Sequence, residues 1–282
     1  MQIILCRYGR GYIRRKRTCL QALLKVRLPS PWFINKGEGV KKRLKHVLNH
    51  FLILLLLPSS AMAATYINYT RVIVNEKDRE STFTVYNEGL RPVLLQLWTE
   101  KESLLERPED IKTPFIILPP IFRLEGNTSR AVRIQFVGDR QTLPEDRESL
   151  FWLNTLEVPP VADSKSGSGA LQVAFRTRVK LFWRPLSLAA NTLEESVKKI
   201  QITASDCGGN RCLLVKNNSP LHVTLMGLTL NDGTEIKQLP DDGLLAPLST
   251  KTVILPKGAT GNRTVETFSW IDDYGVVNTY KN

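Results

Sequence analysis

The stretch Leu171–Pro185, read as L-Q-V-A-F-R-T-R-V-K-L-F-W-R-P, decides how this chain is interpreted. Apolar and polar residues alternate in its first half. In a strand, successive side chains point to opposite faces, so Leu171, Val173 and Phe175 are expected on one face. A strand of this length far exceeds the usual ~5–6 residues. The simplest interpretation is a long core strand of an antiparallel sandwich.

The second half of the stretch differs in character. Past the alternating part, Val179 and Leu181–Trp183 form an almost continuous apolar run in which Lys180 and Arg184 are embedded. Such a run is typical of a buried strand, and the two cations within it are unusual there. We therefore expect one strand with two roles, in which Val179 and Leu181–Trp183 belong to a core.

Short runs of strand-forming residues, separated by turn residues, fill the chain on both sides of this stretch. About seven strands in ~120 residues is the pattern of an immunoglobulin-like sandwich. The first set of expected strands is 65–74, 81–86, 92–99, 115–118, 121–124, 131–137, 150–158 and 171–185. After Pro185 the pattern restarts, and the second set is 199–203, 212–216, 223–230, 250–255, 264–271 and 276–280. Residues 194–203 fit a strand or a short helix-like start, and strand is favoured from Lys199; no internal repeat is visible.

The sequence thus predicts an all-β protein of two immunoglobulin-like β-sandwich domains, residues 64–186 and 187–282, after a leader of residues 1–63. The net charge of +12 lies in that leader, which holds 13 basic residues and one acid. The remaining 219 residues hold 26 basic and 26 acidic residues. A nucleic-acid partner is therefore not expected.

The end of the leader has the pattern of a cleavable signal peptide. A basic segment, Val40–Lys45, precedes the apolar run Phe51–Leu57, and Ala61-Met62-Ala63 is an A-x-A cleavage site. A membrane anchor is the alternative, but the run is far shorter than the ~20 residues that span a bilayer. We expect cleavage after Ala63 and no membrane insertion. Because a signal normally stands at the start of a chain, translation is predicted to begin near residue 40.

Only Cys207 and Cys212 follow the predicted cleavage site, with four residues between them. An even pair at this spacing favours a disulfide across a hairpin in an oxidising compartment. A metal site is the alternative, but it needs further ligands, and His222 is the only histidine after the leader. We predict no metal and no cofactor.

Catalytic motifs are missing from the sequence after the leader. His222 has no nucleophile motif beside it, and neither a Gly-rich phosphate loop nor H-E-x-x-H occurs. Asp272 and Asp273 are adjacent, so in an extended chain their side chains diverge and do not form a glycosidase pair. An enzyme is not expected.

Five charged residues stand in or beside apolar strand patterns, which is their common feature: Arg71, Glu148, Lys180, Arg184 and Asp273. Charged side chains are rarely buried unless they are paired. The alternative is that all five make ordinary surface contacts.

Several segments, in this order, carry a resemblance to a known family: T-R-V-I-V at 70–74, L-P-P-I-F-R-L at 118–124, A-V-R-I at 131–134, L-P-E-D-R-E-S-L-F-W-L-N at 143–154, V-P-P at 158–160, V-K-L-F-W-R-P at 179–185 and D-D-Y-G at 272–275. The chain resembles the PapD-like periplasmic chaperones of chaperone–usher pilus systems. The resemblance implies two sandwiches in a boomerang arrangement and a periplasmic protein that binds, folds and caps pilus subunits.

The resemblance also implies roles for individual residues. Arg71 and Lys180, with Thr70 beside them, match the pair that binds the C-terminal carboxylate of a subunit. Leu171, Val173 and Phe175 match the donor strand that fills the groove of an incomplete subunit.

Glu148, Arg184 and Asp273 match the family's interdomain charge cluster, which orients the two domains.

The short loop at 159–169 resembles the subclass with a short loop between strands F1 and G1. The implied partners are pilins or an adhesin and an outer-membrane usher, and the free chaperone is able to self-associate. The alternative is a secreted structural or adhesive sandwich protein that is itself a pilus subunit; it is expected to lack the Arg71/Lys180 pair.

Overall fold

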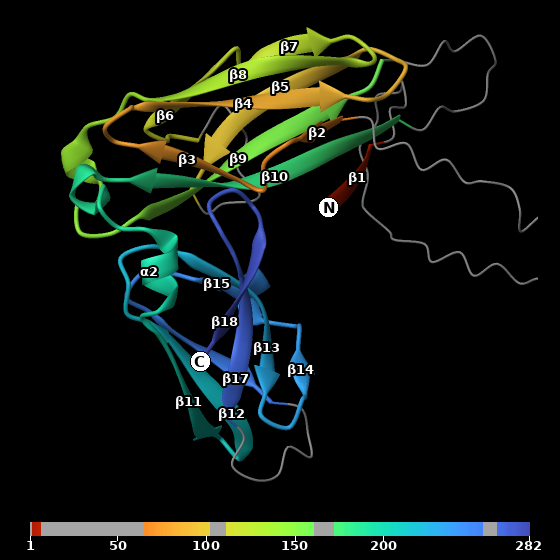
Figure 1. Ribbon diagram of the computed structural model, residues 1–282. Coiled ribbons are helices and arrows are strands. Elements are labelled where there is room, and N and C mark those ends of the chain that lie inside the picture. The colour runs from red at the N-terminus through yellow and green to blue at the C-terminus, as the bar shows by residue number, and fades with distance from the viewer. Residues whose placement is uncertain (1, 7–64, 102–110, 161–171, 256–263) are drawn as a thin grey trace, which may run out of the picture. The chain divides into compact units, whose positions relative to one another are not determined.

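The computed structural model describes residues 2–6, 65–101, 111–160, 172–255 and 264–282. Their strands form two β-sandwiches, each around its own apolar core (Figure 1). The predicted all-β, two-domain fold is confirmed. The first core draws its buried side chains from residues between Val72 and Trp183, and the second from residues between Leu188 and Trp270.

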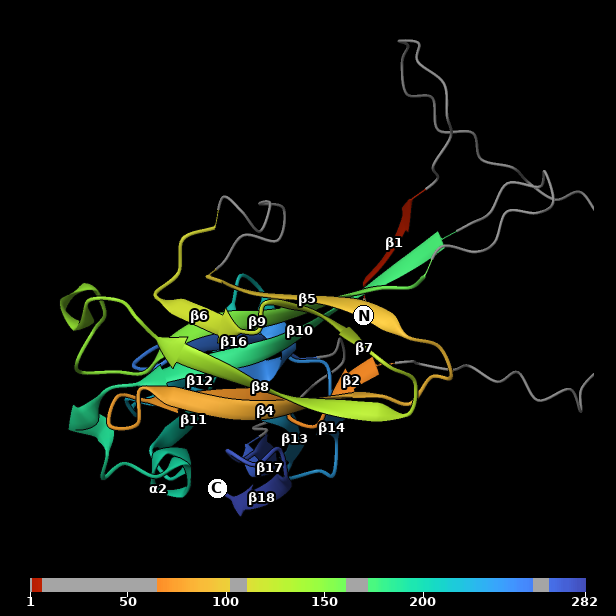
Figure 2. The ribbon, with the colours of Figure 1, turned by 90° about the horizontal axis from the view of Figure 1, so that it is seen from above.

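Two sheets face each other in the first sandwich, and Figure 2 shows them as layers. One sheet has the order β2-β4-β8-β6, and the other has the order β1-β10-β9-β5-β7 with β3 also paired to β10. The strands are β1 (Gln2–Cys6), β2 (Thr65–Ile67), β3 (Arg71–Asn75), β4 (Glu80–Asn87), β5 (Val93–Glu100), β6 (Phe115–Leu118), β7 (Ile121–Leu124), β8 (Thr128–Phe136), β9 (Ser149–Val158) and β10 (Gln172–Arg184).

Alternation along the strands builds the first core. In β6 and β7 every second residue is buried, and the same period runs through the second half of β8. Phe115, Phe136 and Trp183 bring three strands together: the rings of Phe136 and Trp183 stack at 3.9 Å, and Phe115 meets Trp183 edge-on at 6.2 Å. The end of β10 is therefore anchored in this core.

The first predicted strand, 65–74, is two strands in the structure. β2 pairs antiparallel with β4 in one sheet, whereas β3 pairs parallel with β10 in the other. Residues 68–70 carry the chain between the sheets, so the apolar pattern is continuous although the hydrogen bonding is not. This switch places Arg71 beside β10.

Pro119 and Pro120 make a second crossing between the two sheets. β6 ends one sheet and β7 ends the other, and both are edge strands. Proline lacks a backbone N–H and is tolerated at a sheet edge. The predicted edge position of this proline pair is confirmed.

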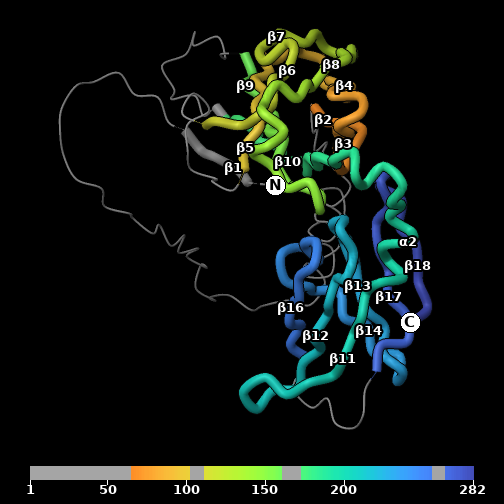
Figure 3. Tube along the Cα trace, turned by 90° about the vertical axis from the view of Figure 1, so that its left-hand side faces the viewer, coloured from red at the N-terminus to blue at the C-terminus, as the bar shows by residue number. Residues whose placement is uncertain are grey.

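The second sandwich contains the sheets β11-β12-β16 and β14-β13-β17-β18, with β15 also paired to β13 (Figure 3). Its elements are α2 (Leu193–Val197), β11 (Ile200–Cys207), β12 (Asn210–Asn217), β13 (Val223–Leu230), β14 (Glu235–Ile236), β15 (Leu244–Leu245), β16 (Thr250–Ile254), β17 (Val265–Ile271) and β18 (Val277–Lys281).

The helix-like start that residues 194–203 allow is present as α2, and the preference for strand from Lys199 is confirmed to within one residue. The Thr192 hydroxyl accepts a hydrogen bond from the backbone N–H of Glu195 at 3.2 Å, and two acids stand in the first turn. Both features stabilise a helix N-terminus. Leu193 and Val197 bury one face of this helical turn, and the strand begins only at Ile200.

The same kind of turn occurs once in each sandwich, although no repeat is visible in the sequence. Asn87 is buried and its side-chain amide donates to the carbonyl oxygens of Arg91, Leu124 and Glu125. Asn217 is equally buried and donates to those of Leu221, Leu245 and Ala246. Each asparagine therefore closes the turn that follows its strand and satisfies carbonyl groups that are out of reach of water.

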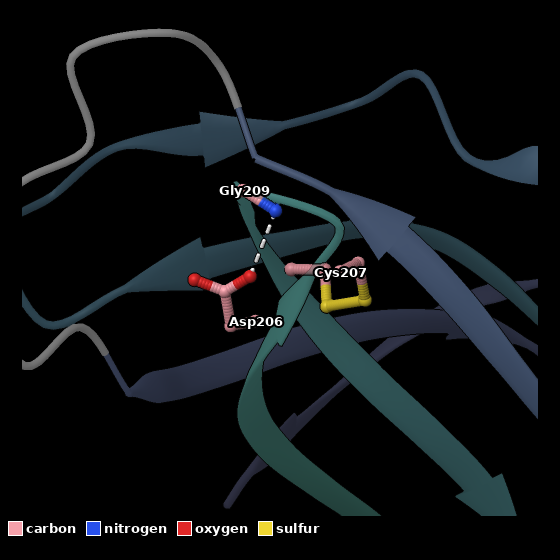
Figure 4. Close-up of a disulfide and its surroundings, with 4 residues drawn as sticks. Asp206, Cys207 and Gly209 are labelled. Atoms are coloured by element: carbon pink, nitrogen blue, oxygen red, sulfur yellow. Dashed lines mark hydrogen bonds between the residues drawn. A yellow bond between two sulfur atoms is a disulfide. The ribbon is translucent and has the colours of Figure 1, made fainter.

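The predicted disulfide is present. Cys207 and Cys212 are bonded across the β11–β12 hairpin, with their Cα atoms 5.9 Å apart. Gly208 and Gly209 turn the hairpin with positive φ angles of 64° and 85°, a conformation that glycine adopts without a Cβ penalty. The Asp206 carboxylate accepts a hydrogen bond from the Gly209 N–H at 2.9 Å (Figure 4).

Most of the predicted leader, residues 7–64, lies outside the described residues, and so do the signal pattern and the predicted start. The segment that is described, β1, pairs antiparallel with residues 172–176 of β10 (Figures 1 and 2). Within the described part of the chain, no helix is long and apolar enough to cross a membrane.

Candidate functional site

Arg71 and Lys180 are neighbours because β3 runs parallel to β10. In the register of this pair, the Cα atom of Lys180 lies opposite that of Arg71. Arg71 is only 5% exposed, and Lys180 is half-buried. Two residues that are 109 positions apart in the sequence therefore place cations side by side.

The surroundings of these two cations leave their charge poorly compensated. Burial lowers the pKa of Lys180, and the charge of Arg71 lowers it further; Asp242 opposes both effects. Burial also lowers the pKa of Arg71, against the attraction of Asp273, Asp272 and Glu148. Adjacent buried cations that share a site favour the binding of an anion, because an anion relieves both the repulsion and the desolvation.

One nitrogen of the Arg71 guanidinium donates a hydrogen bond, and another has no acceptor among the described residues. Its Nη1 donates to the carbonyl oxygen of Ile271 at 3.2 Å, while its buried Nε has no hydrogen-bond partner among the described residues. A buried donor without a partner costs free energy, about 1–3 kcal/mol. A bound carboxylate at this position is able to recover that cost.

The turn between β17 and β18 lies next to Thr70. Gly275 has φ 87°, and a Cβ atom placed on it would lie 2.9 Å from the Thr70 Oγ1. The carboxylate of Asp272 caps the same turn by accepting hydrogen bonds from the N–H groups of Tyr274 and Val276. The D-D-Y-G segment thus builds a tight turn that fits against Thr70, and only glycine fits at its last position.

The three residues of the predicted charge cluster meet. The Arg184 guanidinium donates to the Glu148 Oε1 through Nη2 at 2.9 Å and to the Asp273 Oδ2 through Nη1 at 2.9 Å. The side chain of Glu148 is 1% exposed and that of Arg184 is 11% exposed. The alternative of ordinary surface contacts is therefore wrong for these residues.

His222 is a fourth member of this cluster, and sequence reasoning missed it. Its backbone N–H and its ring Nδ1 both lie 2.9 Å from the Glu148 Oε2. The Glu148 N–H in turn donates to the carbonyl oxygen of Pro220 at 2.9 Å. The only available signal was an isolated histidine in an apolar strand pattern, which does not identify a partner so distant in sequence.

The cluster shifts the pKa values of Glu148 and Arg184. Burial raises the pKa of Glu148, but the hydrogen bond with His222 and the charge of Arg184 outweigh it, so the pKa lies below its ordinary value. Burial lowers the pKa of Arg184, yet its pairing with Asp273 and Glu148 raises it overall. The charges of Glu148 and Arg184 are thus held in their ionised forms at neutral pH.

The predicted core half of the opening stretch is buried, which confirms that prediction. Val179, Leu181 and Trp183 lie in the first core. Phe182 is 3% exposed but points to the opposite face of β10, where its ring lies 5.1 Å from that of His222. The apolar run is therefore continuous because β10 is covered on both faces there.

The predicted donor half of the stretch lacks such cover. Val173 is partly buried and Phe175 is 37% exposed, although both have the same strand parity as the core residues. Leu171 lies outside the described residues. Because β3 pairs only with Lys180–Arg184, the edge of β10 at residues 172–176 is open to another strand, and in this chain β1 lies there.

The described residues do not form a metal site. No group of three or more His, Cys, Asp and Glu side chains is placed to hold a metal ion in that part of the chain. The chemistry that the site offers is anion binding by Arg71 and Lys180, next to the N-terminal half of β10.

Two immunoglobulin-like sandwiches joined directly after a long strand, with paired cations beside that strand, define a class of two-domain β-sandwich chaperones. The chain belongs to the PapD family of pilus-assembly chaperones. Residues 64–189 match "Pili and flagellar-assembly chaperone, PapD N-terminal domain", and residues 195–282 match "Pili assembly chaperone PapD, C-terminal domain". This is a family of chaperones and not of enzymes.

Similar proteins carry names in agreement with this family. The chaperone protein FimB/FhaD of Bordetella pertussis is 38% identical over 232 residues, which cover 81% of this chain and 91% of that protein. The probable fimbrial chaperone YehC of Escherichia coli is 30% identical over 245 residues, which cover 87% and 95%.

Solved structures agree as well. The CupB2 chaperone of Pseudomonas aeruginosa superimposes with a TM-score of 0.62 at 32% identity, covering 77% of this chain and 98% of that one. The SafB chaperone of Salmonella enterica, solved in complex with the SafA pilin, superimposes with a TM-score of 0.62 at 25% identity, covering 79% and 99%. The protein is thus a pilus-assembly chaperone, and the prediction of a chaperone over a structural subunit is confirmed.

Proposed function

We propose that this chaperone binds a pilus subunit by its C-terminal carboxylate and completes the subunit's fold with its own β10 strand. The observation that carries the proposal is the parallel pairing of β3 with β10, which sets Arg71 against Lys180. Both side chains have lowered pKa values, and the Arg71 Nε has no partner among the described residues. Thr70 borders the same position.

The open edge of β10 supports the second half of the proposal. An incomplete sandwich exposes unpaired strand edges, and an added strand supplies their hydrogen bonds. Val173 and Phe175, with Leu171 preceding them, enter the groove of the subunit on one face of the strand. Each large side chain that is fully buried contributes roughly 1.5–3 kcal/mol before the costs of binding.

The anchor and the strand act together. A carboxylate held at Lys180 fixes where the subunit begins along β10, and the alternating side chains then have one register. The subunit is a pilin or an adhesin, it passes to an outer-membrane usher, and no nucleotide or cofactor is required. When no subunit is bound, the exposed strand is able to pair with a second chaperone.

The cellular setting follows from the leader. We propose translation from near residue 40, cleavage after Ala63 and a periplasmic mature protein with domains 64–186 and 187–282. The disulfide between Cys207 and Cys212 agrees with an oxidising compartment. The loop at 159–169, of which residues 161–169 lie outside the described residues, is short in the sequence, and this supports the proposal that the protein belongs to the short-loop subclass.

The first prediction concerns the carboxylate anchor. The chaperone is co-expressed in the periplasm with the subunit encoded by the neighbouring gene, and the yield of the 1:1 complex is measured. Lys180→Ala and Arg71→Ala are each expected to reduce the affinity about 10- to 100-fold, because a charge-assisted hydrogen bond contributes about 1.5–3 kcal/mol. Both variants should remain folded.

Lys216→Ala is the matched control, since this lysine is exposed on β12. A second arm uses a subunit whose C-terminus is extended by a few residues, which moves the carboxylate away. The extended subunit should bind wild type and Lys180→Ala equally weakly. Wild-type capture by both anchor variants would show that the carboxylate-anchor role is wrong.

A further inference from the structure

Glu100, the last residue of β5, is a buried carboxylate outside the anchor and the charge cluster. Its side chain is 1% exposed. Its Oε2 accepts a hydrogen bond from the Arg176 Nη2 at 2.6 Å, and its Oε1 forms an ion pair with the Arg178 Nε at 2.5 Å. One acid of β5 thus holds two arginines of β10 across the intervening strand β9.

Two tryptophans complete this arrangement on the same face of the sheet. The Arg176 guanidinium lies over the Trp98 ring at 5.0 Å, and that of Arg178 lies over the Trp152 ring at 4.1 Å. The Arg176 Nε also donates to the side chain of buried Asn154 at 2.9 Å. We call Glu100, Arg176, Arg178, Trp98 and Trp152 the arginine clamp.

The clamp acts on the part of β10 that lies outside the core and beyond the pairing with β3. From Val179 onward the strand is buried in the core, and from Lys180 onward it also pairs with β3. Before Val179, Thr177 and Phe175 are exposed and Val173 is only partly buried. In this segment, Arg176 and Arg178 therefore connect β10 to the neighbouring strands, on the face of the sheet that points away from the core.

We infer that Glu100 is a positioning residue for subunit binding: through Arg176 and Arg178 it holds residues 173–178 of β10 extended against β9, in register with Lys180. The inference rests on the proposed strand donation and adds the means by which the donated strand is kept ready. A strand that is already straight loses less conformational freedom on binding than one that must first be ordered.

The charges explain why the contacts of both arginines with the neighbouring strands depend on Glu100. Without Glu100, Arg176 and Arg178 are two buried or half-buried cations two residues apart on the same face of β10. Their mutual repulsion and their burial then both favour turning the guanidinium groups out to water. The stacking on Trp98 and Trp152 is lost in that movement, and β10 is released from its outer cover.

The test uses the full chaperone and a purified pilus subunit. Glu100→Gln keeps the shape of the side chain and removes the charge. We expect it to weaken subunit binding about tenfold and to speed amide hydrogen exchange at residues 174–178 of the free chaperone. Exchange in β4 and β8 should not change. The triple variant Glu100→Gln, Arg176→Gln, Arg178→Gln removes the unpaired cations and should recover part of the affinity.

A general loss of stability is distinguished by a matched control. Val132→Ala destabilises the same sandwich from β8, where Val132 is completely buried. At an equal drop in melting temperature, Val132→Ala should leave affinity and exchange in β10 unchanged. If Glu100→Gln loses no more affinity than this control, or if exchange at 174–178 stays at the wild-type rate, the positioning role is wrong.

The test of the clamp and the test of the carboxylate anchor can fail independently of each other. Loss of capture in Lys180→Ala together with unchanged binding by Glu100→Gln overturns the clamp and leaves the anchor intact. Unchanged capture in Lys180→Ala together with weakened binding and faster exchange in Glu100→Gln overturns the anchor and supports the clamp.

Discussion

Glu148 shows how much a single buried residue connects in this protein. One oxygen of its carboxylate accepts a hydrogen bond from Arg184, and the other lies 2.9 Å from the backbone N and from the ring Nδ1 of His222. The backbone N–H of Glu148 donates to the carbonyl oxygen of Pro220. Arg184 continues the chain of contacts to Asp273. A carboxylate with this many partners is stabilised in its charged form, which is why its pKa lies below the ordinary value despite burial.

The pH dependence of stability follows from this shift at Glu148. A depressed pKa in the folded state adds stability above the unfolded value, about 4.3, and that stability is lost as the pH falls through the folded value. Glu148→Gln should therefore cost about 3–5 kcal/mol at pH 7, because a buried pair is broken, and less at pH 3. Urea unfolding at both pH values measures this.

Glu266→Gln serves as the control for that measurement, because Glu266 is exposed on β17. It should change stability little at either pH. An equal loss at pH 7 and pH 3 in Glu148→Gln would mean that ionisation of this carboxyl does not contribute to stability.

Among the elements, β10 carries most of the proposed function. Its C-terminal half is held by β9, by β3 and by the core, and its N-terminal half presents an edge and a partly uncovered face. The same strand thus belongs to two environments. Its unusual length follows from this division, since a core strand alone needs fewer residues than a strand that must also reach a partner.

The proposal that one face of β10 enters the subunit can be tested by adding one charged side chain to that face. Val173→Asp places a carboxylate where an apolar groove is expected, and it should weaken subunit capture at least 100-fold, since an unpaired buried charge costs several kcal/mol. Pull-down of the subunit at graded concentrations gives the affinity. The stability of the free chaperone should change little, because Val173 lies outside the buried core.

Val137→Asp is the matched control, a 55% exposed valine of the same sandwich. It should bind as wild type does. If Val173→Asp captures subunit as well as the control, this face of β10 is not the donated one.

At the scale of the whole molecule, the two sandwiches have separate cores and are linked by few polar contacts. The contacts run from Arg71 to Ile271, from Glu148 to Pro220 and His222, and from Arg184 to Asp273. Each sandwich closes its own turn with a buried asparagine. Because the cores are independent, cooperation between them depends on these contacts.

Arg184→Leu tests that dependence. The wild type is expected to unfold in one calorimetric transition, and the variant in two, because the ionic link between the sandwiches is removed while the volume at this position stays similar. Arg91→Leu, an exposed arginine of the first sandwich, should keep the single transition. A single unshifted transition in Arg184→Leu would show that the sandwiches are coupled by other means.

Much of the fold could be predicted from the sequence, because alternation and turn residues are local properties. The positions of most strands, the proline pair at a sheet edge and the cysteine pair across a hairpin all follow from neighbours along the chain. At Leu193–Val197 the sequence allows a helix-like start or a strand, since five residues carry too little periodicity to decide between them. The split of 65–74 was missed because both halves have the same composition.

The amino-acid sequence by itself determined that this is an all-β protein of two sandwiches, and it singled out Lys180 and Arg184 as charges in an apolar strand. The tertiary structure decided which side chains these charges meet: Arg71 beside Lys180, His222 on Glu148, and Glu100 between Arg176 and Arg178. The physical reason is the different distance along the chain over which the two kinds of interaction act. Backbone preferences act over a few residues, whereas the pairing of β3 and β5 with the sheet of β10 joins residues about a hundred positions apart.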